Sequence, residues 1–284
     1  MEIYLTFDDG IQEGTEEVLA VLKETNVRAT FFLVGTQLSY AIKKDRTQLQ
    51  TLLKEIYIHH TIGNHSYSHA NDCYADYYTN NGIRIDDNGN RRSILLDFEK
   101  SKDTIHQLLY DMQEIDTASC MYPLALSQKM PLARLPGRNT WYVSDPQQPE
   151  GSTQALIRHF ETDSRKGAEE LYRAGYNVFG WNTEWRMTFD FHHDASSNID
   201  RYAPENIWKD RPTETWKQVR DKMLKTSIGN KVILLMHERA FRKGTDKKET
   251  EQLSALINYF KEIGAAFKSL DEYTSSPFQF RNSK

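Results

Sequence analysis

The sequence contains few cysteines: Cys73 and Cys120 are the two thiols among its 284 residues. Two cysteines cannot build the disulfide framework that stabilises small secreted domains. Their separation also lacks the short spacing that is typical of zinc-ligating cysteine pairs. We therefore expect both thiols to be free.

Long apolar runs and an excess of positive charge are also lacking. No run reaches the length of about 18 apolar residues that a membrane-spanning helix needs. The N-terminus has no basic segment, apolar stretch and cleavage site, so the sequence predicts no signal peptide. The net charge is −4 and the pI is near 6.2, without a basic stripe that could neutralise phosphates, so nucleic acid is not an expected partner.

Internal repeats, low-complexity tracts and linkers rich in Pro, Gly or Ser are absent from the sequence. A chain of this length suits either one α/β barrel or two smaller domains. Without a linker, the simpler interpretation is a single domain over residues 1–284.

Strand-like and helix-like segments alternate along the chain. Apolar and β-branched runs occupy residues 2–7, 28–34, 56–62, 131–136, 176–182, 231–237 and 265–270. Helical periodicity marks residues 15–25, 45–55, 94–109, 164–174 and 213–225. Such alternation predicts parallel strands joined by helical crossovers, hence a doubly wound sheet or a (β/α) barrel, and the number of strands favours an incomplete barrel.

Two longer polar segments with interspersed aromatic residues, 70–93 and 186–210, interrupt this alternation. They fit rim loops over a binding groove, or insertions without functional consequence. Within the second segment, His192, His193 and Asp194 resemble a metal cluster. Adjacent strand residues point to opposite faces, so we interpret these three as part of a polar loop.

Two adjacent carboxylates, Asp8 and Asp9, end the first strand-like run and precede Gly10. Catalytic groups of a barrel lie at the carboxyl ends of its strands, which is where these two acids fall. Asp-Gly is also a common turn after a strand, although a turn does not require both positions to be acidic. A cation bound by one of them would offset their mutual repulsion.

His65 and His69 are four residues apart, a spacing that places both imidazoles on one face if the segment forms a helical turn. Taken alone, this pair is also compatible with exposed helical histidines. Together with Asp9, it makes the two-imidazole, one-carboxylate set that catalytic zinc and similar ions use, and Asp8 is then left to take a proton from water. His237 closes the apolar run at 231–237, either as a satisfied core residue or as a proton donor at the same barrel mouth.

The stretches TFDDG, HSYSH, RLPG, NTEW and LLMH, in this order, resemble the five motifs of the NodB-type polysaccharide deacetylases, carbohydrate esterase family four. The resemblance extends from about Glu2 to Tyr273. It implies a distorted, incomplete (β/α)7 barrel, and a metal-dependent hydrolase that removes N-acetyl groups from sugars of the N-acetylglucosamine type.

The same resemblance assigns roles to individual residues. It makes Asp8 the general base, Asp9, His65 and His69 the metal ligands, and His237 the general acid. Arg134 matches the arginine that orients the base. Glu184 stands where an aspartate usually supports the acid histidine, and Trp185 matches the tryptophan packed beside it. We expect zinc as the metal, with cobalt or nickel as alternatives.

Two positions depart from the family pattern. Gly137 occupies the place of an aromatic residue, so a main-chain donor to an oxyanion is retained while an aromatic wall is lost. Glu184 keeps the charge of the usual aspartate on a longer side chain. We expect substrate contacts at Gly137, Trp185 and Trp141, and consider Tyr142 and Tyr77 as further stacking candidates. Packing in the core or at the rim is the alternative for each of these four aromatic residues.

The expected partner is an acetylated glycan, such as peptidoglycan, chitin oligomers or poly-N-acetylglucosamine, and the oligomeric state is left open. Such substrates favour the cell envelope or the exterior, whereas the lack of a signal peptide leaves a cytoplasmic role open. Two other functions remain as alternatives: a metal-dependent C–N hydrolase acting on a small non-sugar amide, and a catalytically weakened relative that binds glycans. An aspartate-nucleophile phosphatase is disfavoured because its two acids are separated by one residue.

Overall fold

Strand β1 (Glu2–Gly10) is the central strand of a curved parallel sheet in the computed structural model. The structure describes residues 1–79, 84–85, 91–113, 132–144, 155–156, 163–188, 211–212, 214–242 and 249–273. Its main sheet follows the order β10-β13-β1-β2-β3-β6-β9, and β14 pairs with the first half of β1. No pairing joins β9 to β10 within these ranges, so the sheet stays open.

The strands of the main sheet are β2 (Thr30–Leu33), β3 (Thr61–Asn64), β6 (Leu132–Ala133), β9 (Asn177–Val178), β10 (Thr183–Glu184), β13 (Lys231–His237) and β14 (Ala266–Lys268), besides β1. Three small antiparallel pairs accompany it: β4 (Arg84–Ile85) with β5 (Arg91–Arg92), β7 (Val143–Ser144) with β8 (Ala155–Leu156), and β11 (Met187–Thr188) with β12 (Arg211–Pro212).

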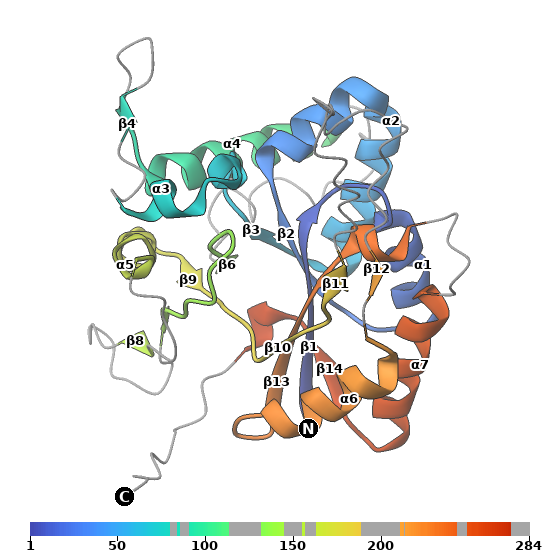
Figure 1. The fold of residues 1–284 in the computed structure, drawn as a ribbon. Coiled ribbons are helices and arrows are strands. Elements are labelled where there is room, and N and C mark those ends of the chain that lie inside the picture. Colours follow the sequence, from blue (N-terminus) through green and yellow to red (C-terminus); the bar gives the residue numbers. More distant parts are fainter. Residues whose placement is uncertain are drawn as a thin grey trace, which may run out of the picture.

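The helices are α1 (Thr15–Glu24), α2 (Gly35–His59), α3 (Tyr74–Thr79), α4 (Ile94–Gln113), α5 (Arg165–Arg173), α6 (Trp216–Thr226) and α7 (Glu249–Glu262), with short 3₁₀ turns at His69–Asp72, Glu238–Phe241 and Leu270–Glu272. Figure 1 shows α1 and α7 along one side of the sheet, and α3 and α4 near its other edge. Among the described residues, no helix combines the length and the apolar character needed to cross a bilayer.

Alternation along β1 divides the core between the two faces of the sheet. Ile3, Leu5 and Phe7 pack with the apolar faces of the surrounding helices. Tyr4 faces the other way and packs with inner residues such as Phe32 and Phe179. Side chains alternate along a strand, so Thr6 and Asp8 lie on the same inner face as Tyr4. The curved parallel sheet with helices outside it confirms the predicted distorted, incomplete (β/α)7 barrel.

Several predicted segments differ from the structure. The predicted strand at 56–62 is wrong over its first part, because Ile56 to His59 form the last turn of α2 and β3 begins at Thr61. The predicted helix at 45–55 is the second part of α2, which has a kink at Asp45, whose carboxylate accepts a hydrogen bond from the Gln48 N–H at 2.9 Å. Helix α7 was not predicted from the sequence.

Candidate active site

Asp8 and Asp9 reach the same site because the end of β1 is irregular. Asp8 pairs in register with His237 at the end of β13, whereas the register with β2 shifts between Asp8 and Gly10. Asp9 lies within this bulge with φ 73°, a left-handed conformation that is uncommon for residues other than glycine. A bulge re-aims a side chain that regular alternation would send to the opposite face.

His65 directly follows β3, and its ring is fixed by a main-chain carbonyl. Its backbone N–H donates to the Leu33 carbonyl at 3.0 Å, which continues the pairing with β2. Nδ1 lies 2.8 Å from the carbonyl oxygen of Arg134. A carbonyl only accepts, so Nδ1 carries the proton and Nε2 keeps its lone pair, the arrangement typical of metal-ligating histidines.

His69 enters the site from a tight turn rather than from a regular helix. Its φ is 51°, and its backbone N–H donates to Oγ of Ser66 at 3.0 Å. Its ring packs beside that of His65, with 5.1 Å between centroids. The expected proximity of the two imidazoles is therefore present, although it arises from a left-handed turn and not from one face of a helix.

Three ligand atoms, one each from Asp9, His65 and His69, lie within 4.8 Å of one another. Oδ1 of Asp9 is 3.1 Å from Nε2 of His69 and 3.5 Å from Nε2 of His65. This oxygen is buried and accepts no hydrogen bond from the described part of the chain. A buried carboxylate oxygen facing an imidazole lone pair is unfavourable unless a cation lies between them, so this donor set fits a divalent metal ion.

The charges of the site follow from its burial. Burial lowers the pKa of His65, and Asp8 offsets this effect only in part, so the neutral form is favoured. For Asp9, burial alone raises the pKa, but His69, His237 and His65 together hold it well below its usual value. A neutral imidazole and an ionised carboxylate are the forms in which these groups ligate metals.

Arg134 holds Asp8 from within the barrel. Its Nη1 donates to Oδ1 of Asp8 at 2.8 Å and to Oγ1 of Thr6 at 2.7 Å. Its remaining donors bind the carbonyls of Phe179 and Gly180 at 3.1 and 2.9 Å, and the guanidinium is fully buried. Oδ2 of Asp8 is left facing the group formed by Asp9, His65 and His69, 3.5 Å from Nε2 of His65.

His237 faces the same set from the end of β13. Its Nε2 lies 3.8 Å from Oδ2 of Asp9. Its Nδ1 is buried and has no hydrogen-bond partner in the described ranges. The predicted support of His237 by the Glu184 side chain is not among the described contacts. The contact described for Glu184 is a hydrogen bond that its main-chain oxygen accepts from Nζ of Lys222 at 2.6 Å. Support of His237 by Glu184 therefore stays a prediction.

Gly137 is covered by an aromatic ring from a different part of the chain. A Cβ at Gly137 would lie 3.0 Å from the ring of Tyr74, and the φ of Gly137 is 63°. The same ring meets His69 edge to face, with 5.8 Å between centroids. The hydroxyl of Tyr78 on the same helix, α3, donates to the Pro136 carbonyl at 2.7 Å. A role for Tyr74 at the site was not predicted from the sequence. The signal that could have found it is its position in segment 70–93, which was interpreted as a possible rim loop over a binding groove.

The tryptophans expected to contact substrate are buried. Trp141 and Trp185 are each 2% exposed. Trp141 packs on Phe179, and Trp185 packs on Phe241 while its Nε1 donates to the Glu214 carbonyl at 2.9 Å. Neither presents an open ring face to a ligand in this structure.

The other stacking candidates differ in burial. Tyr77 is buried and donates to Asp97 at 3.0 Å, while Tyr142 is partly buried against Tyr172. Cys73 is free and exposed. Cys120 and the cluster His192, His193 and Asp194 lie outside the described residues.

Glu238 is a buried acid beside the site that the sequence did not reveal. Its side chain is fully buried, and a Cβ at Gly10 would lie 2.1 Å from its Oε1. Oε2 accepts a hydrogen bond from Nε2 of Gln12 at 3.3 Å. Burial raises the pKa of Glu238 to about 8. A protonated, neutral carboxyl thus lies next to the turn that carries Asp9.

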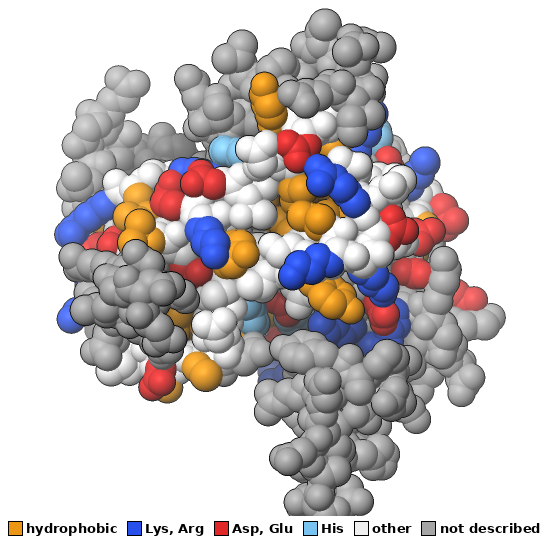
Figure 2. Space-filling view, turned by 90° about the horizontal axis from the view of Figure 1, so that it is seen from above, with side chains coloured by type: hydrophobic (Ala, Val, Ile, Leu, Met, Phe, Trp, Pro, Cys, Tyr) orange, Lys and Arg blue, Asp and Glu red, His pale blue; other side chains and the backbone are white. Residues whose placement is uncertain are grey.

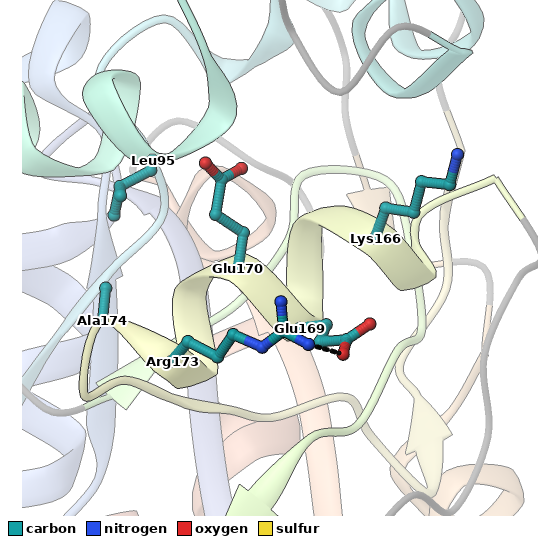
Figure 3. A pocket seen from close by; sticks show the side chains of 6 residues that line it. All are labelled: Leu95, Lys166, Glu169, Glu170, Arg173 and Ala174. Atoms are coloured by element: carbon teal, nitrogen blue, oxygen red, sulfur yellow. Dashed lines mark hydrogen bonds and ion pairs between the residues drawn. The ribbon is translucent and has the colours of Figure 1, made fainter.

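A groove of about 540 Å³ is lined by other residues (Figure 3). It is lined by Leu95 of α4 and by residues of and next to α5: Lys166, Glu169, Glu170, Arg173 and Ala174. Arg173 and Glu169 pair with each other at 2.5 Å. On the face seen in Figure 2, acidic and basic side chains are interspersed among the described residues.

Comparison with known proteins identifies relatives. Residues 1–122 match the family model described as polysaccharide deacetylase. A chitin disaccharide deacetylase of Vibrio alginolyticus is 24% identical over 96% of this chain and 71% of its own length. A peptidoglycan-N-acetylglucosamine deacetylase of Bacillus cereus is 39% identical over 32% of this chain and 31% of its own length.

Solved structures share the fold. The polysaccharide deacetylase Bc1974 of Bacillus cereus superimposes with a TM-score of 0.54 at 19% identity, covering 99% of this chain and 97% of the other. A Streptococcus mutans esterase of carbohydrate esterase family four gives a TM-score of 0.55 at 20% identity, covering 94% and 84%. Residues 1–122 therefore carry the sequence pattern of the polysaccharide deacetylases, and the chain as a whole shares the fold of deacetylases of carbohydrate esterase family four.

Proposed function

We propose that this chain is a metal-dependent hydrolase that removes N-acetyl groups from poly- or oligosaccharides containing N-acetylglucosamine. The observation that carries the proposal is the convergence of Asp9, His65 and His69 beside an arginine-held Asp8. The deacetylases named among the relatives support the substrate class, since their names specify chitin disaccharide and peptidoglycan N-acetylglucosamine.

Asp9, His65 and His69 would hold the metal ion, with zinc as the first candidate and cobalt or nickel as alternatives. When bound, a divalent cation supplies Lewis acidity toward an acetyl carbonyl and makes a nearby water more acidic. His65 is prepared for this role by its bond to the Arg134 carbonyl, which directs its unprotonated Nε2 to the site.

Asp8 would act as general base. Nη1 of Arg134 donates a hydrogen bond to Oδ1 of Asp8 at 2.8 Å, and Oδ2 faces His65. The first oxygen is therefore held in place, while the second can take a proton from water. The deprotonated water attacks the acetyl carbonyl carbon and forms a tetrahedral intermediate. The oxyanion of this intermediate requires hydrogen-bond donors, and the main-chain N–H of Gly137 is our candidate for one of them.

His237 would act as general acid. It pairs in register with Asp8 at the end of the neighbouring strand, and its Nε2 lies 3.8 Å from Oδ2 of Asp9. A protonated imidazole there can donate to the departing amine, so that acetate and a free amino sugar are released.

The test is acetate release from chitin oligomers, peptidoglycan fragments, poly-N-acetylglucosamine and a small non-sugar acetamide. Protein stripped with a chelator would be compared with protein restored with zinc, cobalt or nickel. We expect activity on at least one glycan only after metal is restored, and a loss of about 100-fold or more in Asp8→Asn.

Asp111→Asn is the matched control, because Asp111 is a surface residue on α4 paired with Arg46 at 2.9 Å. It should retain wild-type turnover. Equal turnover of stripped, restored and Asp8→Asn protein would refute the proposal. Activity confined to the small acetamide would instead support a non-sugar C–N hydrolase.

A further inference from the structure

The segment that carries both histidines has an unusual backbone. Ser66, His69, Ala70 and Asn71 have φ values of 68°, 51°, 56° and 48°. Left-handed conformations cost residues other than glycine roughly 1–2 kcal/mol each, with asparagine the most tolerant. Contacts from outside the segment must therefore hold it in place.

The first turn of α4 supplies such contacts through Asp97. Its carboxylate accepts hydrogen bonds from Oγ of Ser68 at 2.8 Å, from the Ser68 N–H at 3.2 Å and from the hydroxyl of Tyr77 at 3.0 Å. Its main-chain carbonyl also accepts from the Tyr67 N–H at 3.1 Å. One residue of α4 thus fixes the two positions that immediately precede His69.

The next residue of α4 fixes the other end of the segment. The Phe98 carbonyl accepts from Nδ2 of Asn64 at 2.8 Å, and Oδ1 of Asn64 accepts from the Ser66 N–H at 3.0 Å. The chain is therefore held on both sides of His65 by consecutive residues of one helix. His65 is also held by Leu33 and Arg134, whereas His69 directly follows Ser68, whose side chain and N–H both bind Asp97.

We propose that Asp97 is a positioning residue that holds His69 in the geometry needed to ligate the metal, an inference that rests on the proposed function. It touches neither metal nor substrate and acts through Ser68. An amide at this position is nearly isosteric, but its one oxygen cannot accept all of these bonds and its NH₂ group would face donors. Asp97→Asn should therefore displace His69 while leaving the barrel folded.

The experiment measures the affinity of chelator-stripped protein for zinc by competition with a chromophoric chelator, and the visible absorption of the cobalt-loaded protein. We expect zinc binding to weaken about 10–100-fold in Asp97→Asn, the usual range for loss of a group that orients a ligand. The cobalt spectrum should change shape, because it reports ligand geometry. Asp111→Asn, on the same helix, should match the wild type in both measurements.

The melting temperature of the stripped protein separates positioning from a purely structural role. Unchanged zinc affinity in Asp97→Asn would overturn the inference, as would an altered melting temperature with a wild-type cobalt spectrum. If Asp97→Asn does not fold, Ser68→Ala decides: several-fold weaker zinc binding supports the inference, and unchanged binding overturns it. Failure of the wild type to bind zinc would instead refute the proposed function.

Discussion

Nδ1 of His65 lies 2.8 Å from the carbonyl oxygen of Arg134, the residue whose guanidinium holds Asp8. One position after β6 thus orients a proposed metal ligand through its main chain and the proposed base through its side chain. The protonation of His65 and the direction of the Asp8 carboxylate are therefore linked by a single residue. Displacement of Arg134 would disturb both groups at once.

Replacing Arg134 by methionine should strongly destabilise the fold. The fully buried guanidinium binds Asp8, Thr6 and two carbonyls, so its removal leaves a buried carboxylate and buried acceptors without donors. We expect the free energy of unfolding to fall by about 3–5 kcal/mol. Urea denaturation of the metal-free protein measures this change.

Arg46→Met is the control for this substitution, because Arg46 makes an exposed ion pair with Asp111. It should cost less than about 1 kcal/mol. Similar losses in the two variants would show that the buried network around Arg134 contributes little.

The main elements of the site could be predicted because they lie at strand ends. Asp8, Asp9 and His237 follow apolar runs, and parallel strands bring their carboxyl ends to one edge. The bulge that turns Asp9 toward the histidines was not predictable, since it depends on the register between β1 and β2. Sequence spacing placed the histidines together for a different reason, a helical face, than the turn that the structure contains.

Contacts between distant segments account for what the sequence did not reveal. Tyr74 reaches Gly137 from a segment whose sequence has no strand or helix periodicity. Glu238 could not be predicted as a buried group, because acidic residues are usually exposed. The misplaced boundary at 56–62 has a local cause, since only His59 and His60 separate the apolar residues at the end of α2 from β3. A short apolar run of this kind fits a helix or a strand equally well.

Removing the ring of Tyr74 should weaken substrate binding. The ring contacts His69 and lies over Gly137, where it can serve as a wall beside the proposed metal ligands. For Tyr74→Ala we expect KM for a glycan substrate to rise about two- to tenfold, which corresponds to about 0.5–1.5 kcal/mol of ring contact. Steady-state acetate release at several substrate concentrations measures KM and kcat separately.

Tyr74→Phe keeps the ring and should retain a wild-type KM. A wild-type KM in Tyr74→Ala would contradict a role for this ring in binding.

Glu238 should make stability fall as the pH rises. Burial raises its pKa to about 8 in the folded protein, compared with an ordinary value of 4.5. Between these values the folded state binds the proton and the unfolded state releases it, so the stabilisation is complete below about pH 4.5 and is lost as the pH rises through 8. The full effect between pH 4.5 and pH 8 is on the order of 5 kcal/mol.

Glu238→Gln resembles the protonated acid at every pH and should remove this decline. Urea denaturation of the metal-free protein at pH 6 and pH 9 measures it, with Glu13→Gln as an exposed control. An identical loss between the two pH values in wild type and Glu238→Gln would show that Glu238 is ionised throughout.

His60 should have the opposite effect on the acid side. It is buried against Phe31, and its Nδ1 accepts a hydrogen bond from the Ala29 N–H at 3.4 Å. Burial, with smaller contributions from His59 and Arg28, lowers its pKa from 6.5 to about 4. Between these values the unfolded state binds more protons, so stability is complete above about pH 6.5 and is lost as the pH falls toward 4.

The variant His60→Asn keeps an acceptor for the Ala29 N–H but does not titrate, so it should lose less stability than the wild type between pH 7 and pH 5. We expect the difference to be on the order of 2 kcal/mol in urea denaturation of the metal-free protein. His59→Asn is the matched control, because the neighbouring His59 is exposed and lies 3.8 Å from Glu55. It should follow the wild-type pH dependence. A weaker pH dependence of stability in His59→Asn, but not in His60→Asn, would contradict this prediction. It would show that the exposed histidine controls acid stability and that the buried His60 ring is protonated in the folded protein without loss of stability.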